Sequence, residues 1–246
     1  MSIIEEIASC CKELRLGGNI TENVKKIEAP DKEQFLLQLL QLEIQHRRNN
    51  RRLRNIKNAG FYTLKGFSQY VFDDIKLPDA LTPDDIIAGE FISNKQNLIM
   101  YGNPGTGKTH LATAIGHCAC RNDLKVGFFR TAGLVNKLLE AKRKHELDKF
   151  LKKLDSLDLI IADEWGYVPL DREGSQLLFH VISECYERKS LIITTNLEFS
   201  RWVNIFYDKD MTTAMVDRLV HHSHLLIFDG DSWRVKNSLI NHQKRS

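Results

Sequence analysis

The segment GNPGTGKTH, which begins at Gly102, contains the residue types that bind phosphate groups. It matches the pattern G-x-x-x-x-G-K-[ST], directly after a predicted strand and directly before a predicted helix. Its glycines allow backbone N–H groups to converge on phosphate oxygens, and the N-terminus of the next helix adds positive potential. Lys108 would contact the β- and γ-phosphates of a nucleotide, and Thr109 would bind Mg²⁺. A glycine-rich turn that binds nothing is the alternative.

We therefore predict ATP and Mg²⁺ as cofactors. The nucleotide-binding residues predicted from this loop are Gly102, Asn103, Pro104, Gly105, Thr106, Gly107, Lys108, Thr109 and His110.

Two acidic residues end a second apolar run, LDLIIADEWG. An acid at the C-terminal end of a parallel strand faces the ligand crevice of the sheet. Asp163 would therefore bind Mg²⁺ together with Thr109, and Glu164 would activate a water molecule for attack on the γ-phosphate. A kinase needs no such base and must exclude that water, so the pair favours an ATPase. Two solvated loop acids are the alternative.

A third polar residue, Asn196, follows the run LIITT. We expect this strand beside the phosphate loop, where the amide of Asn196 could orient the attacking water or contact the γ-phosphate. Asn is also a common turn residue at strand ends, which is the alternative interpretation.

Five short apolar runs are predicted to be the strands that position these residues. Helical apolar spacing occupies the segments between them, at residues 108–122, 131–154 and 172–189. Strands buried on both faces and separated by helices predict an α/β fold with a five-stranded parallel sheet. The strands would be NLIMY, VGFF, LIIA, SLIITT and LLIF.

The first 60 residues read as a small helical domain, and residues 61–246 as the nucleotide-binding domain. From Ile44 to Phe72 the chain has seven Lys or Arg residues and no Asp or Glu, although the whole chain carries a net charge of only +3. Phosphate is the natural counter-charge of such a cluster, and few base-reading side chains accompany it. The cluster predicts DNA binding with little sequence preference, against a solvated helix face. Its candidates are Arg47, Arg48, Arg51, Arg52, Arg54 and Lys57.

A second basic stretch follows the run VGFF on a predicted helix. Acids are interspersed in it, so an ordinary solvated helix fits as well as a DNA-binding one. Its candidate DNA-binding residues are Lys137, Lys142 and Arg143.

Composition narrows the class of protein. Of the 246 residues, 42% are hydrophobic, and no apolar run approaches the ~20 residues that span a bilayer. The first residues lack the profile of a signal peptide, so we expect a cytoplasmic protein. The five cysteines include no C-x-x-C pair, so they signal neither a zinc ribbon nor a thioredoxin-type site. His221, His222 and His224 have no Cys or acid at the usual spacing, which favours surface histidines over a metal site.

Four motifs together resemble those of AAA+ ATPases in the helicase-loader branch: GNPGTGKTHLA, LIIADEWG, ITTN and MVDRLV. Within this branch the chain is most similar to the bacterial IstB family, the ATPase helpers of insertion-sequence transposases, and less similar to DnaC. The resemblance covers nearly the whole chain. It implies a reduced lid, an Arg218 that enters a neighbouring subunit's ATP site, and an Arg234 near the γ-phosphate. Both arginines could instead be surface salt-bridge partners.

The resemblance also implies a function. The chain would self-assemble on duplex DNA when ATP is bound and would assist a transposase in target selection. A helicase loader acting on single-stranded DNA is the second hypothesis, and a small-molecule kinase the third. The predicted catalytic residues are Lys108, Asp163, Glu164, Asn196 and Arg218.

Overall fold

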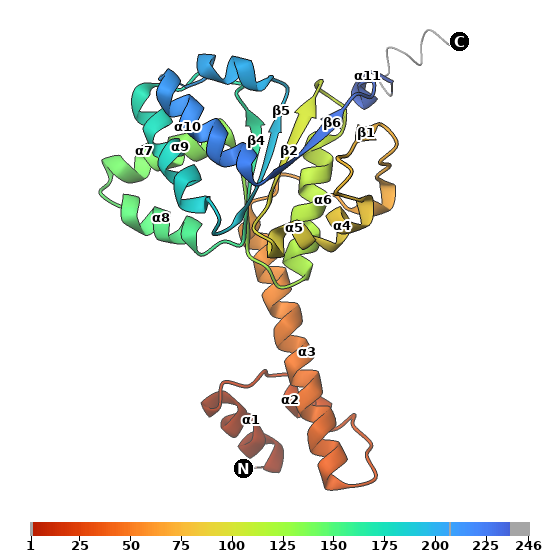
Figure 1. Cartoon of the computed structure of the whole chain (residues 1–246). Helices are drawn as coiled ribbons and strands as arrows, with labels where there is room; N and C mark the ends of the chain where they lie inside the picture. Colours follow the sequence, from red (N-terminus) through yellow and green to blue (C-terminus); the bar gives the residue numbers. More distant parts are fainter. Residues whose placement is uncertain (1, 207, 237–246) are drawn as a thin grey trace. The chain divides into compact units, whose positions relative to one another are not determined.

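The computed structural model describes residues 2–206 and 208–236, and it separates into two compact units that divide between Arg54 and Asn55. The division falls within the long helix α3 (Lys32–Ala59) (Figure 1). None of the helices among the described residues is both long and apolar enough to cross a membrane.

The first unit is helical and ends at Arg54. It contains α1 (Ile3–Glu13), α2 (Ile20–Asn23) and the first part of α3. Ser2 caps α1 and forms a capping box with Glu5, which satisfies N–H groups that the first helical turn leaves without partners.

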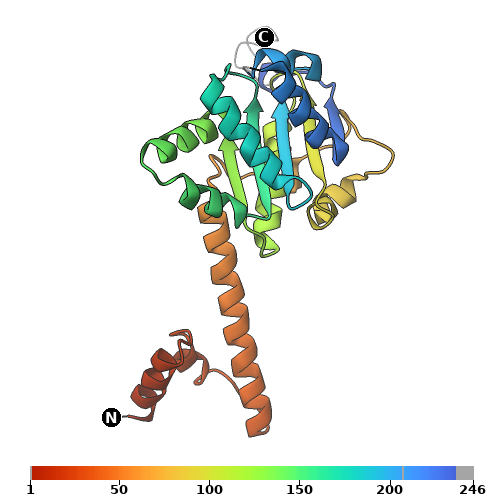
Figure 2. The ribbon, with the colours of Figure 1, turned by 60° about the vertical axis from the view of Figure 1, so that its left-hand side comes forward.

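The second unit is built on one six-stranded sheet with the order β1-β6-β2-β5-β4-β3 (Figures 1 and 2). Its five parallel strands confirm the predicted sheet. The short strand β1 (Ile75–Lys76) adds an antiparallel edge that the sequence analysis missed, because two residues are too few to show a periodic pattern. The parallel strands are β2 (Asn97–Gly102), β3 (Val126–Arg130), β4 (Leu159–Trp165), β5 (Ser190–Thr195) and β6 (Ser223–Phe228).

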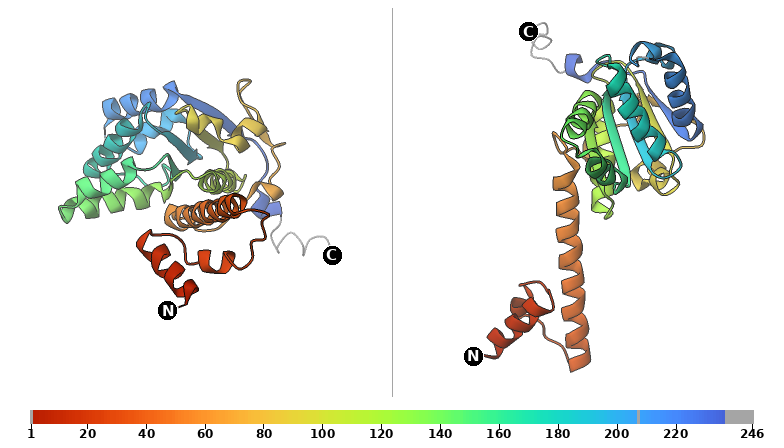
Figure 3. Two further views of the ribbon diagram at one scale, coloured as in Figure 1. Left: turned by 90° about the horizontal axis from the view of Figure 1, so that it is seen from below. Right: turned by 90° about the vertical axis from the view of Figure 1, so that its left-hand side faces the viewer.

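Helices cover both faces of the sheet, and each face has its own apolar core (Figure 3). On one face lie α4 (Pro83–Ala88), α5 (Glu90–Ser93) and α6 (Lys108–Arg121). Thr82 and Asp85 form a capping box at the start of α4, since each bonds the other's backbone N–H. The other face carries α7 (Thr131–Arg143), α8 (Leu147–Asp155), α9 (Arg172–Cys185) and α10 (Lys209–His221).

The segment 131–154, which reads as one helical stretch in the sequence, forms the two helices α7 and α8. His145 interrupts it with a left-handed φ of 57°, and the N–H of Glu146 closes the end of α7 on the carbonyl of Ala141 at 2.8 Å. Splitting the stretch allows Leu138 and Leu154 both to be buried. Shorter elements complete the unit: the 3-10 turns η1 (Phe67–Gln69) and η2 (Phe199–Asn204), and α11 (Trp233–Lys236).

Candidate nucleotide-binding site

The predicted phosphate loop connects the end of β2 to the start of α6. Gly102, Gly105 and Gly107 have φ values of 152°, 86° and 98°, a region that favours glycine. At Gly102 a Cβ atom would also collide with the carbonyl oxygen of Phe228 on β6. The loop therefore needs glycine at these positions both for its backbone angles and for its close approach to the neighbouring strand.

The ammonium group of Lys108 lies over this loop. Its Nζ donates hydrogen bonds to the carbonyl oxygens of Gly102 at 2.6 Å and Asn103 at 2.7 Å. Lys108 is also the first residue of α6, so the N–H groups of the first helical turn open onto the same place. This combination of an ammonium group, a helix N-terminus and positive-φ glycines fits the phosphates of a nucleotide.

Asp163, near the end of β4, contacts Thr109, in the first turn of α6. Thr109 Oγ1 donates to Asp163 Oδ1 at 2.9 Å, and Asp163 is only 3% exposed. A hydroxyl group beside a carboxylate at the end of a phosphate loop is a suitable oxygen-ligand pair for Mg²⁺. These two residues would hold that ion if it binds here.

Thr194 on β5 is a member of this group that the sequence analysis missed. Its hydroxyl donates to Asp163 Oδ1 at 2.5 Å and accepts the backbone N–H of Glu164 at 3.1 Å. The Thr194 hydroxyl thus contacts both predicted acids, Asp163 through its carboxylate and Glu164 through its backbone. The signal that could have found it is a polar residue near the end of an otherwise apolar strand.

Glu164 leaves the regular strand at an irregularity in β4. Its φ is 57°, and the pairing of β4 with β5 shifts between Ala162 and Trp165. Its side chain is 41% exposed, and its carboxylate lies 3.3 Å from Nε of Arg130, at the end of β3. The bulge therefore separates the roles of two adjacent acids, because Asp163 is buried while Glu164 reaches water.

Arg130 was not among the predicted site residues. Its guanidinium lies 4.7 Å from the ring centre of Tyr62, while its Nε faces Glu164. An arginine directly after the apolar run VGFF was the available signal. Arg130 thus forms an ion pair with Glu164, the acid predicted to activate the attacking water.

Asn196 directly follows β5, the strand that pairs with β2. Thr195 lies opposite Tyr101, one residue before the phosphate loop begins, so Asn196 enters the site from the neighbouring strand end. Its side chain is half-buried.

Two segments flank the phosphate loop. On one side Tyr70 lies near Gly107, and His110 bonds the carbonyl of Gly66 at 3.2 Å. On the other side the N–H of Trp233 donates to Gly105 at 3.0 Å, which brings α11 to the loop. Arg234 belongs to α11, but its side chain lies outside the part of the chain that the structure describes.

The structure does not bring Arg218 to its own phosphate loop. Arg218 lies near the end of α10, just before β6 begins at Ser223. In the register of β6 with β2, Ser223 pairs with Asn97 and Phe228 with Gly102. Because β6 spans about 17 Å, Arg218 lies toward the amino ends of these strands, whereas the phosphate loop lies at their carboxyl ends. The Arg218 guanidinium bonds the carbonyl of Ala214 at 3.1 Å and lies 5.1 Å from the ring centre of Phe179.

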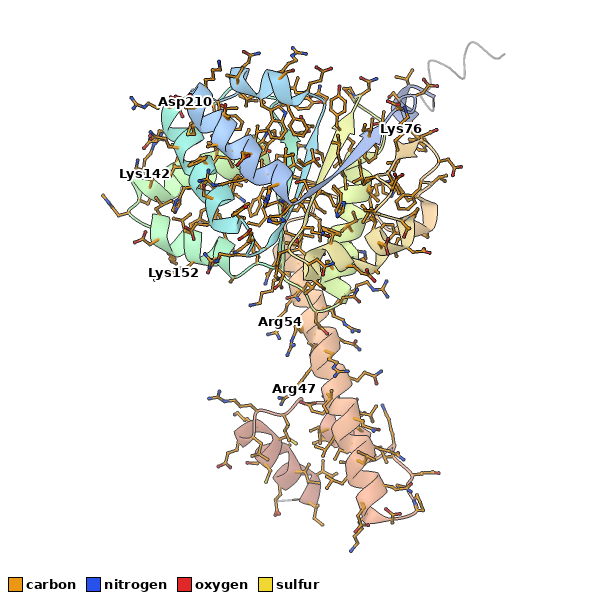
Figure 4. All side chains as sticks on the ribbon, viewed as in Figure 1. Arg47, Arg54, Lys76, Lys142, Lys152 and Asp210 are labelled. Carbon is orange, nitrogen blue, oxygen red and sulfur yellow. The ribbon has the colours of Figure 1, made fainter. Side chains whose placement is uncertain are left out.

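The predicted DNA-binding arginines are on the surface of α3, where Figure 4 labels Arg47 and Arg54. Arg47 has an internal role, because its Nε bonds Glu43 at 2.7 Å and its Nη2 bonds the carbonyl of Arg15 at 2.6 Å. Arg52 is half-buried, and the other predicted cations of this helix are exposed: Arg48, Arg51, Arg54 and Lys57.

The basic stretch on α7 is partly neutralised. Lys142 forms an ion pair with Glu173 at 2.7 Å, and Lys137 lies 5.4 Å from the ring centre of Phe129. Arg143 is exposed. Figure 4 shows Lys142 at the surface of the second unit.

Comparison with known families decides the relationship that the motifs indicated. The sequence profile described as IstB-like ATP binding protein matches residues 16–241. The chain belongs to this family. The IstB resemblance predicted from the four motifs is therefore confirmed.

Relatives in the IstB family carry insertion-sequence names. An insertion sequence ATP-binding protein of Sinorhizobium fredii is 36% identical over 206 residues, 83% of this chain and 69% of the relative. The ATP-binding protein of insertion sequence IS21 from Pseudomonas aeruginosa is 34% identical over 203 residues, 82% of this chain and 77% of the relative. An IS21-like relative from Bacteroides fragilis is 28% identical over 243 residues, 95% of this chain and 90% of the relative.

Solved structures share the fold. AMPPCP-bound DnaA from Aquifex aeolicus has a TM-score of 0.52 at 19% identity, covering 66% of this chain and 50% of that one. DnaI has a TM-score of 0.52 at 13% identity, covering 68% of this chain and 89% of that one. The α/β sheet with its phosphate loop is thus the P-loop AAA+ fold that the sequence analysis predicted.

Proposed function

We propose that this IstB family protein is an Mg²⁺-dependent ATPase that assembles on duplex DNA and assists a transposase. The observation that carries the proposal is the contact of Thr109 with Asp163, which joins the phosphate loop after β2 to the acids near the carboxyl end of β4. The insertion-sequence names of the relatives support the role in transposition.

In this proposal Lys108 exchanges its two carbonyl partners for the β- and γ-phosphates. Thr109 and Asp163 would hold Mg²⁺, which when bound neutralises charge on the phosphates. Because the three interactions converge on one place, they would position the γ-phosphate before any chemistry begins.

Glu164 is the proposed general base. Its side chain is 41% exposed, so a water molecule can reach its carboxylate, whereas Asp163 is buried and occupied by two hydroxyl groups. Glu164 would accept a proton from the attacking water. Asn196 would orient that water from the adjacent strand end, and Arg130 would control the position of the Glu164 carboxylate.

Arg218 is proposed to act on the ATP of a neighbouring subunit. It lies toward the amino ends of the strands, away from its own phosphate loop at their carboxyl ends, so an action in its own subunit would need a large rearrangement. Hydrolysis would then depend on assembly. The exposed arginines of α3 would contact DNA phosphates with little sequence preference.

ATP hydrolysis by the purified chain tests this function when it is measured with duplex DNA, with single-stranded DNA and without DNA. We expect the greatest stimulation by duplex DNA. Stimulation by single strands alone would favour a helicase loader, and phosphate transfer to an added small acceptor would favour a kinase.

A substitution of the proposed base, Glu164, tests the hydrolysis step. Glu164→Gln should bind ATP as the wild type does but turn it over about 10²–10⁴-fold more slowly, because the amide keeps the shape and cannot accept the proton. Glu173→Gln is the control, since Glu173 is also about half-exposed and paired with a cation. Unchanged turnover in Glu164→Gln would move the catalytic role to another residue.

A further inference from the structure

Three side chains that can bind metals lie together where β5 and β6 begin. Glu187 is in the turn after α9, and His221 and His222 are at the end of α10. One ligand atom from each lies within 4.8 Å of the other two. The phosphate loop is at the opposite, carboxyl ends of the strands, so the proposed ATPase chemistry does not use this cluster.

Direct contacts already join the cluster. His222 Nε2 lies 3.0 Å from Glu187 Oε1, and His221 Nδ1 lies 2.9 Å from the hydroxyl of Tyr186. The two imidazole rings are 4.2 Å apart between their centres. His224 does not belong to the cluster, since its Nε2 contacts Gln96 at 3.2 Å.

Hydrogen bonds fix the backbone on both sides of this cluster. The carbonyl of His222 accepts a hydrogen bond from the N–H of Asn97, at the start of β2, at 2.7 Å. The turn after α9 is fixed by Lys189, whose buried ammonium group bonds the carbonyl of Asp155 at 2.7 Å. Within that turn Glu187 has a φ of 55°, which is uncommon for a residue with a side chain. The fold therefore holds the Glu187 backbone in an unfavourable conformation beside the two histidines.

We propose that Glu187, His221 and His222 bind a divalent transition metal of the Zn²⁺ class. Two imidazoles and one carboxylate are a donor set that Zn²⁺ accepts, with the fourth position left for water or another ligand. When Nδ1–H of His221 donates to the hydroxyl of Tyr186, Nε2 of that ring is left for the metal, and the hydrogen bond orients the ring.

The geometry requires only a small closure. Zinc bonds of about 2.0–2.2 Å place tetrahedral ligand atoms about 3.3 Å apart. The pair formed by His222 and Glu187, at 3.0 Å, already matches this spacing. His221 is exposed, so a small rotation of its side chain that keeps the Tyr186 hydrogen bond would cover the remaining distance.

Binding would connect two separate segments, the α9–β5 turn and the α10–β6 junction. The metal would replace any proton shared between His222 and Glu187 and release it to solvent. Arg218 lies one turn before His221 on α10. The metal would therefore stabilise the helix end that carries this arginine.

Metal titration of the full chain, stripped with a chelator and free of nucleotide, tests the proposal. We expect one Zn²⁺ to bind with proton release, and Co²⁺ to give the visible absorption of a tetrahedral site. Glu187→Gln and His222→Ala should each weaken Zn²⁺ binding by at least about 100-fold. Tyr186→Phe should weaken it less, by about 10-fold, because it removes only the orienting bond.

His180→Ala is the matched control, since His180 is exposed on α9 but does not belong to the cluster. It should bind metal as the wild type does. Circular dichroism and the melting temperature without metal show whether each variant is folded. Equal Zn²⁺ affinity in the wild type, Glu187→Gln and His222→Ala would overturn the proposal, as would no Zn²⁺ binding by the wild type.

Discussion

Thr194 shows at the scale of single residues how the site is held together. Its hydroxyl donates to Asp163 and accepts from the N–H of Glu164, so it connects the proposed metal ligand to the proposed base. Asp163 is 3% exposed, and an ionised carboxylate so deeply buried needs its hydrogen-bond donors. Thr194 is therefore a positioning residue for two acids at once.

Thr194→Val should lower kcat more than it lowers ATP affinity. The valine has nearly the same shape but leaves Asp163 short of one donor, which costs about 1–3 kcal/mol of stability. The backbone of Glu164 also loses its partner, so the base is less well placed. Steady-state kinetics and denaturant unfolding measure the two effects.

The control for this change is Thr113→Val. Thr113 is a buried threonine that bonds the carbonyl of Thr109 within α6 and contacts neither acid. If Thr194→Val lost stability with an unchanged kcat, its role would be only structural.

At the scale of elements, α3 combines structural and surface cations. Arg47 is bonded to Glu43 and to the carbonyl of Arg15, and so joins α3 to the segment after α1. Arg48, Arg51 and Arg54 are exposed and have no such internal role among the contacts of the described residues. The basic cluster read from the sequence thus contains two kinds of arginine.

Neutralising Arg48, Arg51 and Arg54 together should weaken binding to duplex DNA and flatten its dependence on salt. Each phosphate contact that is lost should reduce the log–log slope by about 0.9. Anisotropy titrations over a range of salt concentrations measure this slope.

Arg47→Gln serves as the comparison, because it should also destabilise the first unit. An unchanged slope in the triple variant would mean that this surface faces protein or solvent instead of DNA.

Glu43 makes the first unit sensitive to acid. Burial by itself raises the pKa of Glu43, but hydrogen bonds from Arg47 and from the N–H of Gly17 outweigh it and keep the pKa below the usual 4.5. A pKa that is lower in the folded than in the unfolded state stabilises the fold above the unfolded pKa. That contribution is lost as the pH falls through the folded pKa.

We therefore expect the amides of residues 15–47 to lose protection from hydrogen exchange as the pH falls from neutral to below 4.5. Exchange must be corrected for the pH dependence of its intrinsic chemical rate. Glu43→Gln should be less protected at neutral pH and should change less with pH. Equal pH dependence in both proteins would remove Glu43 as the cause.

At the scale of the whole molecule, the role proposed for Arg218 requires an ATP site shared between two subunits. The phosphate loop lies at the carboxyl ends of the strands and Arg218 toward their amino ends, so under this proposal each subunit would supply a different part of the site to each of two neighbours. An arginine supplied in this way can change the rate of phosphoryl transfer by 10³–10⁵-fold.

Arg218→Ala should bind ATP nearly as the wild type does, because its own phosphate loop is intact. Its hydrolysis and its ATP-dependent assembly should both fall. Mixing it with Lys108→Ala should restore part of the DNA-stimulated ATPase activity, since some interfaces then pair an intact loop with an intact arginine.

Arg201→Ala, a change at another exposed arginine, should need no partner for activity. Failure of the mixture despite demonstrated co-assembly would show that Arg218 serves its own subunit or only the fold.

The sequence by itself determined the phosphate loop, the five parallel strands and the two acids near the end of β4. Each of these depends on residues that are neighbours along the chain, whose spacing and types report local geometry directly. The capping box of Thr82 and Asp85 was predictable for the same reason. Two local features escaped it: the two-residue strand β1, which is too short for a pattern, and the break at His145 between α7 and α8.

Only the tertiary structure decided which distant side chains meet. Thr109 and Asp163 are 54 residues apart, and Glu187 and His222 are 35 residues apart. Their contacts depend on the order and register of the strands, which a single sequence does not encode as a local pattern. For this reason the sequence analysis did not associate Glu187 with the histidines. For the same reason it did not distinguish Arg47 from the other arginines of α3.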